Sequence, residues 1–87
     1  MLTDKQRWFC DEKLKTRLTN TGIRGIVWDN FTGYFVVRDN NKAYIDELND
    51  LTEAVETLVC QVYGFPKIEP DTVFAIIEYC GAEKHLR

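Results

Sequence analysis

The sequence predicts a single α+β domain, and three observations support this fold class. Apolar residues recur at helical spacing over 44–62, two β-branched and aromatic segments flank a loop at 29–33, and 87 residues fit one domain. We therefore expect a β-hairpin or a three-stranded antiparallel sheet packed with about three helices. The order of elements would be αββαα or αβββαα, in one domain spanning residues 1–87.

The first helix is predicted from Asp4 to about Thr19. Thr3 is a suitable N-cap, acidic residues come early in this segment and basic residues come late, which suits the helix dipole. Gly22 is placed to end the helix.

A β-hairpin is predicted next, from strands at 23–28 and 34–38 joined by the five residues 29–33. This loop length would place Trp28 opposite Tyr34 and Arg24 opposite Arg38. The opposite face of the hairpin is our choice for the core, and it holds Ile23, Val27, Phe35 and Val37.

Residues 42–63 allow two interpretations. One is a single long helix, because the apolar stripe is unbroken; its members are Tyr44, Leu48, Leu51, Val55, Leu58 and Val62. The other is a third strand over 42–46, followed by a shorter helix that Asp50 caps. We favour the long helix on the strength of the stripe. This stripe could form the core of a monomer or the seam of a homodimer.

A last helix is predicted from Pro70 or Asp71 to Cys80, with Gly81 as its C-cap. The tail, residues 82–87, is expected to fray.

An acidic ridge is the first candidate binding surface. In the long helix, one face would carry carboxylates at about one per turn, namely Asp46, Asp50, Glu53 and Glu56. The first three alone, Asp46, Asp50 and Glu53, would spread over roughly 10 Å of helix rise, too far to chelate one ion, so we expect no metal site. Such a ridge would suit a protein partner with a basic surface. In size, charge and mixed composition the chain resembles small acidic DNA-mimicking inhibitors, including some phage anti-CRISPR proteins, although no motif carries the resemblance.

The hairpin face is the second candidate binding surface. It combines residue types that are enriched in binding hot spots, namely Arg24, Trp28, Phe31, Tyr34 and Arg38. The same aromatic and arginine side chains could stack on bases and pair with phosphates. Single-stranded nucleic-acid binding is therefore an alternative, although the pI of about 5.0 favours a protein partner.

Several enzyme classes lack support in the sequence. The chain contains no Ser, its one histidine is His85 near the end, and its glycines form no phosphate-binding loop. Three cysteines without a CxxC pair, Cys10, Cys60 and Cys80, predict reduced thiols rather than a disulfide framework or a zinc site. Cys60 is expected to be exposed beside Glu53 and Glu56. We expect no enzyme activity and no cofactor.

The functional expectation is a small cytoplasmic protein-binding module, an accessory or inhibitory protein, monomeric or homodimeric. Residues Met1 to Arg7 lead into a charged helix rather than a signal peptide, and no apolar stretch approaches the ~18 residues of a membrane span. A structural homodimeric subunit is the further alternative.

Overall fold

The computed structural model describes residues 1–86 and has three helices against one three-stranded sheet. The helices are α1 (Asp4–Phe9), α2 (Leu51–Thr57) and α3 (Pro70–Tyr79). The strands are β1 (Ile26–Asp29), β2 (Tyr34–Arg38) and β3 (Tyr44–Leu48), antiparallel in the order β1-β2-β3. The predicted α+β class is confirmed, in the order αβββαα with a short 3-10 helix, Glu83–His85, after α3.

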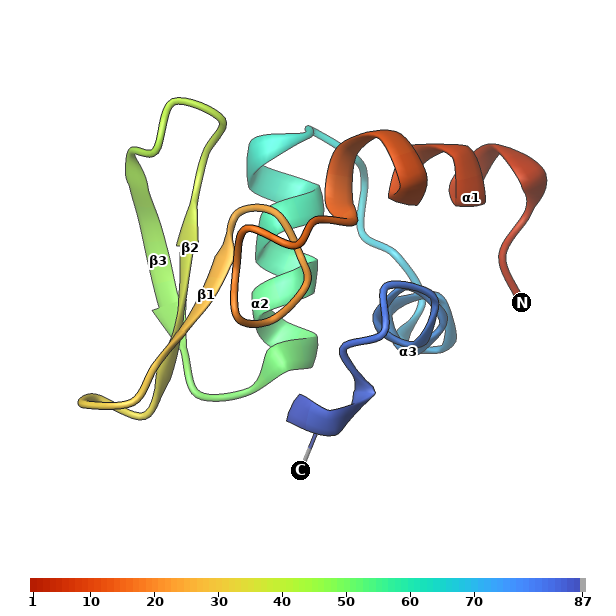
Figure 1. Cartoon of the computed structure of the whole chain (residues 1–87). Coiled ribbons are helices and arrows are strands. Elements are labelled where there is room, and N and C mark those ends of the chain that lie inside the picture. Colours follow the sequence, from red (N-terminus) through yellow and green to blue (C-terminus); the bar gives the residue numbers. More distant parts are fainter. Residues whose placement is uncertain (87) are drawn as a thin grey trace.

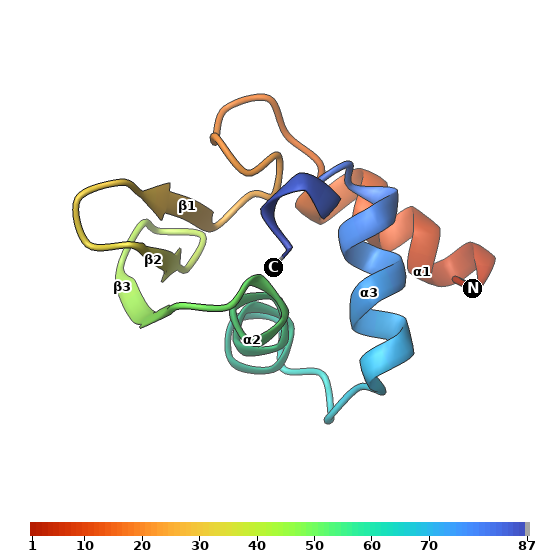
Figure 2. The same cartoon turned by 90° about the horizontal axis from the view of Figure 1, so that it is seen from below.

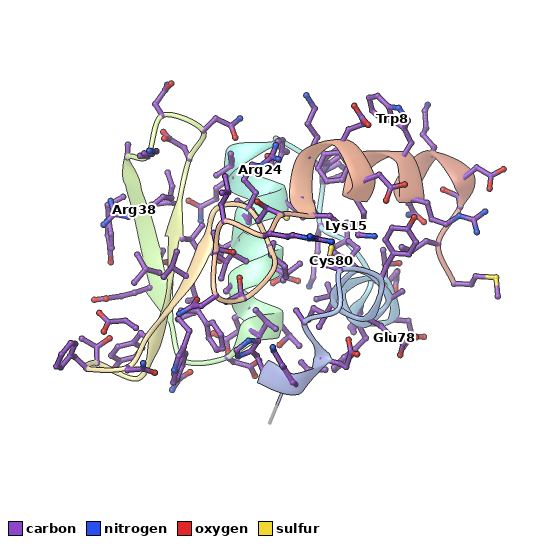
Figure 3. The ribbon with its side chains drawn as sticks, in the orientation of Figure 1. Trp8, Lys15, Arg24, Arg38, Glu78 and Cys80 are labelled. Atoms are coloured by element: carbon purple, nitrogen blue, oxygen red, sulfur yellow. The ribbon has the colours of Figure 1, made fainter. Side chains whose placement is uncertain are left out.

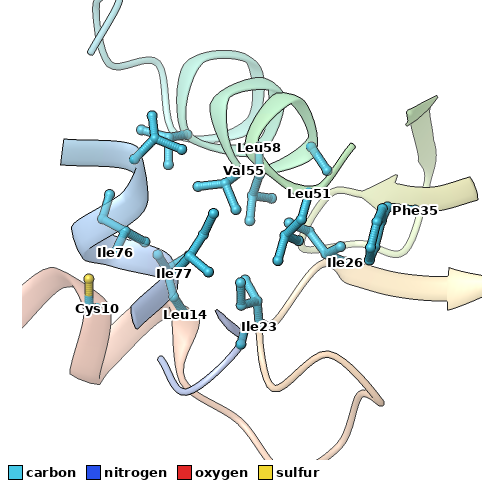
Figure 4. Close-up of a cluster of buried hydrophobic side chains, with 14 of the residues drawn as sticks. Cys10, Leu14, Ile23, Ile26, Phe35, Leu51, Val55, Leu58, Ile76 and Ile77 are labelled. Carbon is cyan, nitrogen blue, oxygen red and sulfur yellow. The ribbon is translucent and has the colours of Figure 1, made fainter. Parts of the chain in front are cut away.

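Helix α2 lies between the sheet on one side and α1 with α3 on the other (Figures 1 and 2). It packs against β2, β3 and α3. One hydrophobic core joins side chains from the sheet, from α2 and from the helices on the far side of α2 (Figure 4). Its largest fully buried side chains include Leu14, Ile23, Ile26, Phe35, Leu51, Leu58 and Ile77.

The first helix is shorter than predicted. Thr3 caps it as expected, with a capping box to Gln6, and α1 continues as a π-helical segment, Cys10–Leu14. The helix then ends because the chain folds back: the Arg24 N–H donates to the Leu14 carbonyl at 2.6 Å. Threonine-rich residues 16–21 have low helix propensity, and Thr21 instead donates its hydroxyl to the Ile26 carbonyl at 2.7 Å.

The register of the hairpin differs from the prediction by one residue. Asp29 pairs with Tyr34, so the loop has four residues rather than five, and Trp28 pairs with Phe35. A one-residue shift turns every side chain of a strand to the other face. Phe35 and Val37 are therefore buried as predicted, but Ile26 takes the core position that we assigned to Val27.

The single long helix over 42–63 is wrong, and the alternative with a third strand is correct. β3 occupies 44–48, and Asp50 caps α2 by accepting from the Thr52 N–H at 2.9 Å. α2 continues as a π-helical segment, Leu58–Val62. Leu51, Val55 and Leu58 of the apolar stripe lie in the core of this chain, while Tyr44 and Leu48 belong to the strand.

The C-terminal segment packs back onto the fold. Ala82 is fully buried, and His85 lies between the loop after α1 and the sheet: its Nε2 is 3.2 Å from the Asn20 carbonyl, and its ring meets Phe35 edge-on. Residues 82–86, expected to fray, thus contact the rest of the domain, and position 87 lies outside the described residues.

Candidate functional site

No helix within residues 1–86 covers the face of the sheet turned away from α2 (Figure 1). We call it the outer sheet face. The register places these residues on it: Val27, Tyr34, Val36, Arg38, Tyr44 and Glu47. Three of its members are substantially accessible, with Val27 41%, Tyr34 40% and Tyr44 53% exposed, whereas Val36 is half-buried. Phe31 at the tip of the hairpin is fully exposed.

The structure divides the predicted hairpin face. Tyr34 and Arg38 lie on the outer sheet face, and Phe31 lies at its tip. Trp28 lies on the inner face instead, with its ring 4.6 Å from that of Phe35. Its backbone N–H and carbonyl are both bound by the Asn20 side chain, at 2.8 and 2.9 Å, which closes part of the free edge of β1. Arg24 precedes β1 and is exposed.

Arg24 and Arg38 nevertheless line one cavity of about 380 Å³ beside the outer sheet face. Lys42, in the turn between β2 and β3, lines it too, and Leu18 and Val27 contribute apolar surface. We call this cavity the basic pocket. Sequence reasoning brought the two arginines together but missed Lys42, whose position depends on the turn; the Asn40-Asn41 pair before it was the available signal.

The acidic ridge does not exist as a continuous helix face. Asp46 lies half-buried on β3, Asp50 is the N-cap of α2, and only Glu53 and Glu56 share the helix. Asp50 also accepts from the Thr52 hydroxyl at 2.8 Å, so its carboxylate serves the helix terminus. The prediction of evenly spaced carboxylates is wrong because the segment 44–50 is a strand and a cap rather than helix.

A second cavity, of about 320 Å³, is lined mainly by apolar side chains. Its walls include Trp8, Phe9, Val59, Phe65, Ile68 and Ile76. The Phe9 ring stands edge-on to those of Tyr63 and Phe65, each with centroids 5.0 Å apart. Lys5 is the one charged residue among the described residues that line this cavity. No sequence pattern predicted it, because its walls come from four separate segments.

Polar side chains also meet between α1 and α3. The Tyr79 hydroxyl donates to the Asp11 carboxylate, with oxygen contacts of 3.0 and 3.1 Å, and this hydrogen bond raises the pKa of Tyr79. The Lys15 Nζ lies 3.8 Å from the Asp11 carboxylate and 4.9 Å from the Tyr79 ring centroid. The neighbouring thiols of Cys10 and Cys80 also interact: this interaction lowers the pKa of Cys10 and, together with burial, raises the pKa of Cys80.

The three thiols differ in burial, with Cys10 buried and Cys60 and Cys80 half-buried. Cys10 is fully buried, so a substrate cannot reach it, and all three cysteines are free thiols. Cys60, expected to be exposed, is half-buried, with its Sγ 3.9 Å from the Pro66 carbonyl. Within residues 1–86, no three His, Cys, Asp or Glu side chains gather in a way that could hold a metal ion.

None of the helices described over residues 1–86 is long and apolar enough to cross a membrane. Comparisons with protein-family models, with curated protein sequences and with solved structures gave no significant match to this chain. The outer sheet face and the two cavities are therefore interpreted on their own physical chemistry.

Proposed function

We propose that this protein is a non-enzymatic module that binds another protein through the outer sheet face. The observation that carries the proposal is the contrast across the sheet: α2 covers one face, while Val27, Tyr34 and Tyr44 stay exposed on the other. Tyrosine and arginine are enriched among binding hot spots, and Arg38 lies among these apolar residues. The rigid, amphipathic rings of Tyr34 and Tyr44 suit a protein interface.

The two edges of the sheet are protected against pairing with a strand of another molecule. The side chain of Asn20 occupies backbone groups of the β1 edge, and β3 carries Asp46 and Glu47, which discourage unspecific pairing of strands. A partner is therefore expected to meet the face of the sheet rather than to extend it. A narrower version, an inhibitor that occupies a basic nucleic-acid-binding surface, depended on a continuous acidic helix face, and we do not build on it.

Single-stranded nucleic-acid binding is the weaker candidate. Trp28, the strongest stacking residue of the predicted platform, packs against Phe35 on the core side of the sheet. The chain also carries a net charge of −3. Both observations favour a protein partner.

Affinity capture with two matched variants tests the proposal. Tyr34→Thr/Tyr44→Thr removes aromatic area from the outer sheet face and keeps good strand propensity. Phe74→Ala removes a comparably exposed ring, 48% accessible, from α3. Both proteins should stay folded. The tagged wild type and Phe74→Ala should capture the same stoichiometric protein after nuclease treatment, and the double variant should lose it.

Three outcomes would overturn the proposal. They are capture of that protein by the double variant at wild-type level, loss of capture on nuclease treatment, and loss with Phe74→Ala alone. A second copy of this chain as the captured species would identify the outer sheet face as a homodimer interface, which size-exclusion chromatography with light scattering would show independently.

A further inference from the structure

The basic pocket holds positive charge that the protein does not neutralise. Within residues 1–86 the ion pairs are Arg7 with Asp4 and Lys15 with Asp11, so Arg24, Arg38 and Lys42 have no carboxylate within ion-pair distance. The protein as a whole is acidic, with a net charge of −3. Three unpaired cations around one cavity of an acidic protein therefore need an explanation.

Among residues 1–86, Asp39 supplies the one carboxylate that lines the pocket, and it is already engaged. Asp39 accepts from the backbone N–H groups of Asn41 and Ala43, both at 2.9 Å, and so holds the turn between β2 and β3. It reduces the local positive potential but leaves the cations in excess.

One of the three cations, Arg38, is held in place before any ligand arrives. The Arg38 Nη1 donates to the Lys42 carbonyl at 3.0 Å, which fixes the guanidinium beside the turn. Lys42 itself has φ 66°, a left-handed conformation that glycine adopts far more easily. Pre-organised charged groups lose less conformational entropy on binding.

The three cations enter the pocket from different elements: Arg24 precedes β1, Arg38 ends β2, and Lys42 lies in the turn before β3. Figure 3 shows Arg38 on the side of the sheet away from α2, and Arg24 near the loop that follows α1. Charge distributed in this way suits an extended ligand with several negative groups better than one small anion. Apolar surface lies between them, because Leu18 is 91% exposed and Val27 belongs to the outer sheet face.

We propose that the basic pocket receives an acidic, extended segment of the protein partner, with an apolar side chain seated on Leu18 and Val27. This inference rests on the proposed function, because Val27 and Arg38 belong to both the pocket and the outer sheet face. It names the partner chemistry as acidic, the opposite of the basic partner that the predicted ridge indicated. Carboxylates of the partner supply the negative charge that Arg24, Arg38 and Lys42 lack within residues 1–86.

A titration of the whole ¹⁵N-labelled chain with a short acetylated peptide tests the inference directly. The probe carries one central Leu flanked by Glu residues, and a matched peptide has Lys in place of each Glu. The Glu peptide should shift the amide signals of residues 18, 24–27 and 38–42, and the shifts should weaken as salt is added. The Lys peptide should leave these signals unchanged.

Three variants sharpen the titration. Arg24→Glu/Arg38→Glu should weaken binding of the Glu peptide by at least about tenfold. Lys5→Glu/Lys67→Glu makes the same change in net charge outside the pocket and should retain most of the affinity. Lys42→Gly removes a charge and also removes the backbone strain of a side-chain-bearing residue at positive φ. This variant should therefore unfold at the same or a higher temperature than the wild type, and it should bind the Glu peptide about threefold more weakly.

The inference is overturned if the Glu peptide shifts no pocket signals, if the two double variants weaken binding equally, or if a thymidine oligonucleotide of matched length binds at the pocket more tightly than the peptide. The last result would assign the pocket to a nucleic-acid backbone instead.

The affinity capture described above shows whether the inference about the basic pocket fails alone or together with the proposed function. If Arg24→Glu/Arg38→Glu still captures the partner that Tyr34→Thr/Tyr44→Thr loses, the outer sheet face binds the partner without help from the basic pocket. If neither variant loses the partner, both proposals fail.

Discussion

The two faces of the sheet are built by the same three strands and have opposite environments. On the inner face, Ile26, Phe35 and Val37 are almost fully buried against the helical layer. On the outer sheet face, Val27, Tyr34 and Tyr44 alternate with them along the strands and remain exposed. Because burial of apolar surface stabilises a fold, we expect the side chains on the first face to contribute much more to stability than those on the second. Under the proposed function, the outer apolar residues contact the protein partner.

The largest expected effect is on the inner face, at Phe35. Phe35→Ala should lower the free energy of unfolding by about 3–5 kcal/mol, because it leaves a cavity under α2. Tyr34→Ala, one residue away on the outer sheet face, should lower it by less than about 1 kcal/mol. Urea unfolding of both variants measures the contrast, and similar losses at the two positions would mean that the faces are not distinct.

The second largest expected loss of stability is at Gly25, which lies just before β1. Gly25 has φ 94°, and a Cβ there would come within 2.9 Å of Leu58 Cδ1 and 3.0 Å of the Arg38 carbonyl. Gly25→Ala should therefore destabilise the protein by about 2 kcal/mol or more.

Gly33 provides the matched control for Gly25. It also has positive φ, 77°, but no atom within 4 Å of the added carbon, so Gly33→Ala should cost only about 1 kcal/mol. Thermal unfolding compares the two variants, and an equal loss of stability would show that close packing against Leu58 adds nothing to the cost.

The third effect distinguishes the strand-and-cap arrangement from a long helix. Asp50→Ala removes the acceptor for the Thr52 N–H and should cost about 1 kcal/mol. Inside a continuous helix the same substitution would raise stability, since alanine has the higher helix propensity. The sign of the change in urea midpoint decides between the two structures.

The smallest effect is at Val27. Val27→Thr keeps the β-branched shape and should change the free energy of unfolding by no more than about 0.5 kcal/mol, because the side chain is exposed. With the hairpin shifted by one residue, Val27 would face the core, and the buried hydroxyl would cost about 1–3 kcal/mol. A loss in that range would contradict the observed register.

The sequence predicts the fold class well and the strand faces only in part. Alternation along β2 correctly places Phe35 and Val37 in the core. For β1 the same rule fails, because the face depends on the length of the loop, and Asp29 belongs to the strand rather than to the turn. A difference of one residue in a turn cannot be recognised from hydrophobic pattern alone.

The apolar stripe over 44–62 led to the wrong prediction of a single long helix, for a physical reason. Tyr44 and Leu48 fit the spacing of a helix, yet each also fits a strand, and pairing with β2 decides their structure. The signal for the correct boundary was present in Asp50, a strong N-cap residue before Leu51. The predicted acidic ridge is lost with the long helix, whereas the proximity of Arg24 to Arg38 is retained because it needs only the hairpin.

Photo-cross-linking from two positions tests the central claim most directly, namely that the outer sheet face binds a protein partner. A benzophenone amino acid replaces Tyr34 on the outer sheet face or Phe74 on α3, both exposed. Irradiation in lysate, followed by mass spectrometry, should give one dominant protein adduct from position 34 and none from position 74. An adduct from position 74 alone, or the same set of adducts from both positions, would contradict the claim.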